Sequence, residues 1–308
     1  MSISLAAAGL GGAWRAATTT ASAPIGVADA LFVVSGLMWL VLLAGYIRHG
    51  GARWRNLMHD LRDPGQGFLL AYVPIVGMLF VGQFARFGLD AARWAYVVFA
   101  AMAAFVAARL LAHWFTGTLR SSPPHLGHLL PVSSLPFIAS SIASGLQWPE
   151  LAFAAFAVGV VYTFAVGAVV IGGLMTGPDL PLPARPALTI LIIPPATGGL
   201  AWLAAHRGAV DAVGYGFAGL LAFTTLIVVC LLPYLRQPSF HMGVWIFAFP
   251  IAAGSNFAIR WFHGADVPAW RPLTWVVLGA ATLSFVALGT ATLFHASRRG
   301  PRSRSATA

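Results

Sequence analysis

The sequence VWIFAFPIAAGSN, from Val244 to Asn256, lies within an apolar run long enough to cross a lipid bilayer. Pro250 stands near its middle, directly after Phe249. A proline inside a helix removes one backbone hydrogen bond and displaces the carbonyl group one turn earlier, so a kink is expected. In lipid, the freed backbone groups must be satisfied by protein or water. The stretch therefore predicts a kinked helix that faces the interior of a bundle, with Phe249 at the bend.

The composition extends this interpretation to the whole chain. Of its 308 residues 59% are hydrophobic and 8% are charged, whereas soluble domains carry about 25% charged residues. The net charge of +10 comes from arginine, since the sequence contains no lysine. Arginine-rich cytoplasmic loops explain this charge better than nucleic-acid binding, so no nucleic-acid partner is expected. The predicted fold class is an all-α, polytopic membrane protein.

Ten apolar runs predict ten transmembrane helices. The first is about 12 residues long, or roughly 18 Å against a hydrocarbon core of about 30 Å. It is too short to span, which indicates a buried half-helix or, as we favour, a start codon assigned too late. The ten runs are Ile3–Trp14, Ala28–Ile47, Phe68–Phe84, Trp94–Phe115, Leu129–Leu146, Leu151–Leu174, Ala187–Ala205, Val213–Leu235, Met242–Phe262 and Leu273–Phe294.

Residues 1–297 are expected to form one transmembrane domain, followed by a basic cytoplasmic tail at 298–308. The loops after the even runs, together with the tail, hold 11 arginines, and the opposite side holds 6. Arginine concentrates on the cytoplasmic side of a membrane. This count predicts a multi-pass protein of the cell inner (plasma) membrane with both termini in the cytoplasm.

Prolines recur in alternate runs. Runs 3, 5, 7 and 9 contain them at intervals of 62, 58 and 56 residues: Pro74, Pro136, Pro194 with Pro195, and Pro250. Runs 2, 4, 6 and 10 contain none, and run 8 has Pro233 near its end. A period of this size indicates one repeated helical hairpin. Five such hairpins would place kinked helices on an inner ring around a central pore. The alternative is that proline is simply common in membrane helices.

All eight carboxylates lie in loops or at the ends of runs. Cation and proton pathways usually need a carboxylate at membrane depth. A pathway without one, in a basic protein, is suited to small inorganic anions. Small polar residues supply candidate pore-lining hydroxyls, although each is also typical of helix packing. The candidates are Ser133, Ser134, Ser140, Ser141, Ser144, Thr197 and Ser255.

Arg109 is expected to be the only charge at depth. It extends to the cytoplasmic headgroups, or it serves as a structural tie, or it attracts anions near the inner mouth. Phe249 fits an aromatic pore gate, or else ordinary packing. Cys230 is the only cysteine, and no catalytic triad, phosphate loop or zinc-ligand spacing occurs. We therefore expect no enzyme activity, no metal and no cofactor.

Five stretches resemble the tellurite-resistance/dicarboxylate transporter (TDT) family, which includes bacterial TehA and the plant guard-cell slow anion channels. They are SLAAAGLGGAW, HLLPVSSLPFIAS, LTILIIPPATGGLAWL, VGYGF and VWIFAFPIAAGSN. The resemblance implies ten helices in five hairpins, odd helices around a pore occluded by Phe249, and a homotrimer with one pore in each protomer. It also implies passive conduction of small monovalent anions such as chloride and nitrate.

The alternative function is a secondary transporter or efflux protein for a C4-dicarboxylate or a tellurite-type oxyanion. Two departures from the family pattern stand out. Ser4 occupies a position where the family usually has proline, and the stretch YTFAVGAVV, from Tyr162 to Val170, lacks the glutamate of a bacterial relative. We therefore expect the first pore-lining helix to be incomplete or mis-started.

Overall fold

The computed structural model describes residues 1–63, 67–117 and 125–298, and no β-strand occurs in these ranges. Most of the predicted tail at 298–308, and Arg120, lie outside the described residues. The helices are α1 (Ser2–Ala21), α2 (Ile25–Arg48), α3 (Trp54–Asp60), α4 (Tyr72–Phe84), α5 (Leu89–Phe115), α6 (Leu135–Gly145), α7 (Pro149–Thr176), α8 (Ile193–Ala205), α9 (Ala212–Cys230), α10 (Leu232–Leu235), α11 (Ala248–Gly264) and α12 (Trp270–Arg298).

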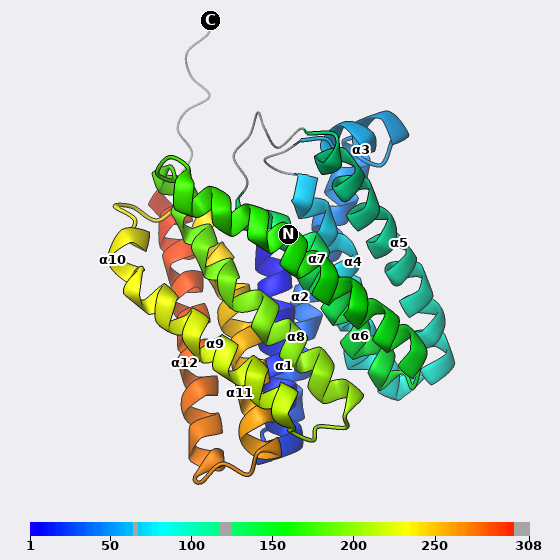
Figure 1. Ribbon diagram of the computed structural model, residues 1–308, viewed down its shortest axis with the longest axis vertical. Coiled ribbons are helices and arrows are strands. Elements are labelled where there is room, and N and C mark those ends of the chain that lie inside the picture. Colours follow the sequence, from blue (N-terminus) through cyan, green and yellow to red (C-terminus); the bar gives the residue numbers. More distant parts are fainter. Residues whose placement is uncertain (64–66, 118–124, 299–308) are drawn as a thin grey trace, which may run out of the picture.

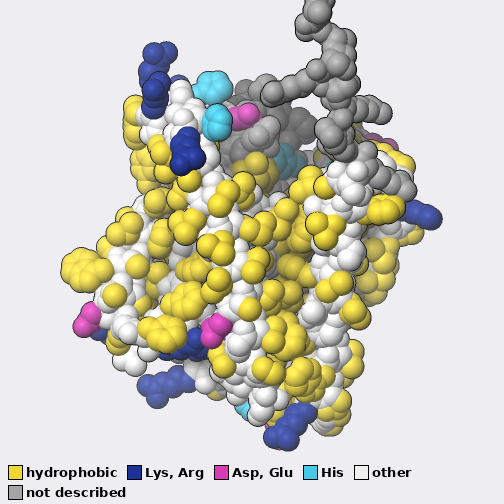
Figure 2. All heavy atoms as spheres, turned by 180° about the vertical axis from the view of Figure 1, so that it is seen from behind, with side chains coloured by type: hydrophobic (Ala, Val, Ile, Leu, Met, Phe, Trp, Pro, Cys, Tyr) yellow, Lys and Arg dark blue, Asp and Glu magenta, His cyan; other side chains and the backbone are white. Residues whose placement is uncertain are grey.

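Nine helical segments in the described ranges are long and apolar enough to cross a membrane. They correspond to the second through tenth apolar runs of the sequence. Figure 2 shows the outer surface that results, with hydrophobic side chains over the middle of the molecule and arginines mainly toward its ends. This arrangement confirms a polytopic helical membrane protein, because a soluble fold would bury such helices.

The helices pack as consecutive pairs: α1 with α2, α4 with α5, α6 with α7, α8 with α9, and α11 with α12. In the segments that contain α4, α6, α8 and α11, the buried share is 56, 89, 67 and 50%. For α2, α5, α7, α9 and α12 it is between 11 and 28%. The proline-containing helices therefore form the interior of the bundle, and the helices that follow them cover its outside (Figure 1).

Helix α1 differs from the expectation for the first run. It extends for 20 residues, to Ala21, rather than ending near Trp14. The threonines after Arg15 continue the helix, because their hydroxyls donate to carbonyls of the preceding turn; Thr18 Oγ1, for example, lies 3.0 Å from Trp14 O. The left-handed Ser22 (φ 58°) ends it. Helix α1 packs against α2, α4, α11 and α12, and so belongs to the interior.

Each inner proline-containing helix changes its geometry where its proline begins the α-helical part. A 3₁₀ helix precedes α4, α8 and α11, and a π-helix precedes α6. The prolines occupy the first three positions of the α-helices: Pro74 in α4, Pro136 in α6, Pro194 and Pro195 in α8, and Pro250 in α11. Proline lacks the N–H that would bond four residues back, so it is tolerated where one helix type ends and the next begins.

Figure 1 shows how the ends of the bundle are arranged. Helix α3 and the C-terminal end of α12 lie at one end, and the connections α8–α9 and α11–α12 lie at the other. Helices α1 and α11 run parallel, because Gly9 meets Phe249 and Gly12 meets Asn256. We call the end with the α8–α9 connection the distal end.

Candidate functional site

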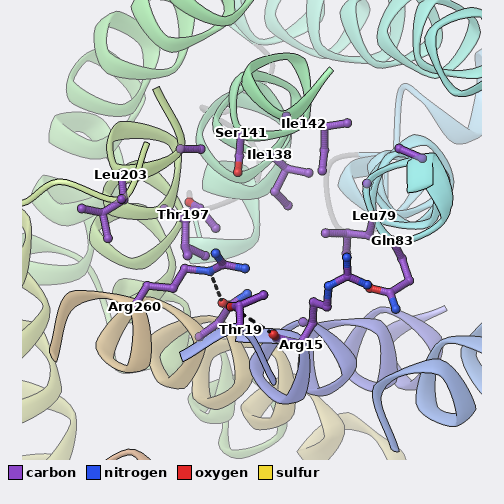
Figure 3. Close-up of a pocket in the computed structure, with 18 of the residues that line it drawn as sticks. Arg15, Thr19, Leu79, Gln83, Ile138, Ser141, Ile142, Thr197, Leu203 and Arg260 are labelled. Carbon is purple, nitrogen blue, oxygen red and sulfur yellow. Dashed lines mark hydrogen bonds between the residues drawn. The ribbon is translucent and has the colours of Figure 1, made fainter. Parts of the chain in front are cut away.

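A wide cavity of about 570 Å³ occupies the distal half of the bundle interior. All five inner helices contribute to its walls, mainly through their C-terminal halves. The lining residues used below are Gly12, Arg15 and Thr19 of α1, Gln83 of α4, Ile138, Ser141 and Ile142 of α6, Thr197 and Leu203 of α8, and Asn256, Arg260 and His263 of α11. The wide cavity is therefore the common space between the inner helices (Figure 3).

The charged residues in this lining are all basic. Arg15, Arg207 and Arg260 line the wide cavity together with His263, and no carboxylate belongs to its described lining. Figure 3 shows the side chains of Arg15 and Arg260 extending into the space from α1 and α11. A low-dielectric cavity walled by one sign of charge concentrates ions of the opposite sign. The wide cavity therefore attracts anions.

Few protein partners neutralise these arginines. Arg260 Nε donates to Asn256 Oδ1 at 3.0 Å. The Arg15 Nη1 atom is buried, with no hydrogen-bond partner among the described residues. Asp29 of α2 is already held by Arg86, whose Nη2 lies 2.7 Å from each carboxylate oxygen, and by Gln83 Nε2 at 2.7 Å. The side chains of Arg15 and Arg260 thus face the cavity without a carboxylate partner among the described residues.

On the other side of Phe249, the space between the inner helices nearly disappears. The remaining narrow space has a volume of about 10 Å³, which is about the minimum for a single water molecule. The same five helical segments line it, mostly with apolar side chains: Ser2, Leu5, Tyr72, Leu130, Ile190, Ile193, Trp245, Ile246, Phe249 and Pro250. An apolar space of this volume excludes hydrated ions by size and by loss of hydration.

Phe249 is buried, with 6% of its surface exposed. A Cβ atom on Gly9 of α1 would lie 3.0 Å from Phe249 Cδ2. Asn256, which lines the wide cavity, follows Phe249 by seven residues, or about 10 Å of helix. Phe249 therefore lies between the narrow space and the wide cavity.

The predicted lining hydroxyls fall in different places. Thr197 lines the wide cavity, and its Oγ1 donates to Ile193 O at 2.8 Å. Ser144 Oγ donates to Ser140 O at 3.0 Å within α6. Ser133 and Ser255 are buried. None of these four serines belongs to the lining of either space, whereas Ser141, which was also predicted, lines the wide cavity.

The expectation that Arg109 is the only charge at depth was wrong. Arg109 lies in α5, partly buried and outside the lining of both spaces, whereas Arg15 and Arg260 line the wide cavity. The sequence carries a signal for Arg260, because Phe249, Asn256 and Arg260 are separated by seven and four residues and so share one helix face. Arg15 was treated as a loop residue, since α1 was expected to end before it.

Comparison with known proteins identifies the family of this chain. A family model described as SLAC1, voltage-dependent anion channel, matches residues 1–293. The tellurite resistance protein TehA homolog of Haemophilus influenzae is 23% identical over 244 residues, which cover 77% of this chain and 73% of that protein.

Two plant proteins, from Arabidopsis thaliana, are also similar. The S-type anion channel SLAH2 is 25% identical over 199 residues and the guard cell S-type anion channel SLAC1 is 24% identical over 197 residues. Each match covers 62% of this chain, but 37% and 34% of those longer proteins. The family model spans nearly the whole described fold, including both the narrow space and the wide cavity. The chain therefore belongs to the SLAC1 family of voltage-dependent anion channels.

Proposed function

We propose that this protein passes small monovalent anions, of the chloride and nitrate type, passively along the central axis between its inner helices. These helices are α1, α4, α6, α8 and α11. Phe249 closes the pathway in the state described here. The observation that carries the proposal is the junction of two spaces on one axis: a carboxylate-free cavity with arginines in its wall, and an apolar constriction at Phe249. The charges attract anions, and the constriction prevents their passage.

The cellular arrangement follows from the same proposal. The protein lies in the cell inner membrane. Helix α1 crosses the membrane in addition to the nine long segments, which makes ten crossings, and both termini face the cytoplasm. The wide cavity then opens away from the cytoplasm. We propose a homotrimer in which each protomer has its own pathway, and expect neither a cofactor nor catalytic activity.

A second candidate is a secondary transporter for a C4-dicarboxylate or a tellurite-type oxyanion. The shape of the interior favours it, because a cavity of about 570 Å³ that is closed at one end also fits a carrier in one of its two alternating states. The name of the Haemophilus influenzae relative refers to tellurite resistance. A carrier must bind and release its substrate in each cycle, whereas an opened channel need not.

Anion flux into liposomes separates the two candidates. Purified wild-type protein and Phe249→Ala are reconstituted in vesicles that contain a dye quenched by chloride, with valinomycin and potassium to balance charge. A channel predicts faster chloride entry in Phe249→Ala, rising with chloride concentration without early saturation. Unchanged chloride entry, together with saturable counterflow of labelled succinate, would reject the channel in favour of the carrier.

A further inference from the structure

Arg15 and Arg260 enter the wide cavity from two neighbouring parallel helices (Figure 3). Both side chains line the same cavity, so two positive charges share one enclosed space. Two like charges inside a membrane protein are costly unless something neutralises them. Asp29, a nearby carboxylate, is engaged by Arg86 and Gln83. The pair therefore needs a negative partner that the described part of the chain does not provide.

The local packing holds this arrangement in place. A Cβ atom on Gly12 would lie 2.9 Å from Asn256 Nδ2, so glycine at this position leaves room for the asparagine between α1 and α11. Asn256 Oδ1 then fixes Arg260 through its Nε. The two terminal nitrogens of Arg260 have no hydrogen bond to the described residues, and neither does the buried Nη1 of Arg15.

We propose that Arg15 and Arg260 form a binding site for a small oxyanion in the wide cavity, separate from the constriction at Phe249. An oxyanion is favoured over a halide because a planar guanidinium group presents paired N–H donors that match two oxygen atoms. Two guanidinium groups can donate hydrogen bonds to different oxygen atoms of the same oxyanion. The site deepens the proposed function and rests on it, because an anion bound here has entered the pathway.

Thermal unfolding in detergent tests this site without any transport. Sodium chloride is replaced stepwise by sodium nitrate at constant ionic strength, and the unfolding midpoint is followed. A ligand that binds the folded state raises the midpoint as its concentration rises. We expect wild-type protein to gain stability as nitrate replaces chloride. Arg15→Gln and Arg260→Gln should show apparent nitrate affinity weaker by about tenfold or more.

Two further variants sharpen the test. Arg271→Gln removes one exposed charge outside the cavity lining and should keep the full response to nitrate. Arg260→Lys keeps the positive charge but loses the paired N–H donors of the guanidinium group. This variant should therefore lose the preference for nitrate over chloride while its net charge stays the same. Arg260→Lys also tests the site if either glutamine variant fails to fold.

The outcomes are distinct. A wild-type midpoint that does not rise in nitrate, or an equal rise in all four variants, overturns the site. If nitrate has no effect while Phe249→Ala still carries chloride, the site fails and the proposed function stands. If nitrate stabilises the wild-type protein but Phe249→Ala carries no current, the site stands and the proposed function fails.

Discussion

Gly9 of α1 and Phe249 of α11 are in such close contact that a Cβ atom on Gly9 would lie 3.0 Å from the phenylalanine ring. The same Cβ would lie 3.1 Å from Ala252 Cβ, one turn further along α11. The absence of a side chain at residue 9 therefore determines where the ring can rest. The closed state of the proposed pathway depends on this contact as much as on Phe249 itself.

Gly9→Ala should displace the Phe249 ring and weaken the closure. We expect chloride conductance above that of the wild type but below that of Phe249→Ala, because the ring is shifted rather than removed. Currents across planar bilayers measure this. The control is Gly216→Ala in α9, where nothing lies within 4 Å of the added methyl group. If Gly9→Ala and Gly216→Ala conduct equally, the contact has no part in closure.

Gly199 in α8 serves packing rather than closure. A Cβ atom there would lie 2.5 Å from Phe257, whose side chain is fully buried. Overpacking of this kind costs about 1–3 kcal/mol, so Gly199→Ala should lower the unfolding midpoint in detergent. Gly219→Ala, in open space on α9, should be neutral or slightly stabilising, since alanine favours helix over glycine by about 1 kcal/mol. Equal midpoints for the two variants would contradict this packing.

Asp211 caps the N-terminus of α9 and predicts a dependence of stability on pH. Its Oδ1 accepts from Gly214 N at 2.9 Å and from Trp202 Nε1 at 2.8 Å. The hydrogen bond from Gly214, followed by that from Trp202, lowers the pKa of the Asp211 carboxyl below its usual 3.8. The stabilisation is therefore complete above pH 3.8 and is lost as pH falls through the lowered pKa.

Asp211→Asn should be less stable than the wild type at pH 6, and the difference should shrink as the pH falls below 3.8. Thermal unfolding at several pH values measures this difference in stability. Asparagine is the suitable replacement because it keeps the shape of the cap without its charge. A difference that stays constant across this range would exclude the charge of Asp211 as the cause.

The proposed membrane orientation is testable because Cys230 is the only cysteine. In a Cys230→Ser background, Gly208→Cys in the α8–α9 connection should react with an impermeant maleimide added to intact cells. Arg53→Cys, next to α3 at the other end of the bundle, should react after the membrane is opened. The reverse pattern would place the wide cavity on the cytoplasmic side.

Much of this fold follows from sequence patterns. The apolar runs predicted ten transmembrane helices, and the second through tenth correspond to long apolar helical segments among the described residues. The alternation of prolines predicted which of these segments lie inside. Both features can be read from contiguous sequence, because an apolar run sets the length of a helix and the missing N–H of proline affects only the neighbouring turn. The extent of α1 was missed, since Arg15 and the threonines after it resemble a polar end although their side chains face a cavity or bond to their own helix.

The site depends on contacts that no local pattern encodes. Phe249 meets Gly9 across 240 residues of sequence, and the wide cavity combines Arg15 with Arg260. The spacing of Phe249, Asn256 and Arg260 places the three residues on one face of α11, although we did not predict this face from the sequence. The opposing face of α1 appears only when the two helices are packed together. Apolar partners of the constriction such as Leu5 and Leu130 resemble any other core residue in the sequence.

The most direct test of the account is the chloride current through Phe249→Ala in a planar bilayer, beside wild-type protein and Phe247→Ala. Phe247 lies two residues away and outside the lining of the narrow space, so it controls for the loss of one aromatic ring. We predict a current at least about tenfold larger in Phe249→Ala than in the other two, because removing the ring opens the constriction. A folded Phe249→Ala protein as silent as the wild type would contradict closure by Phe249.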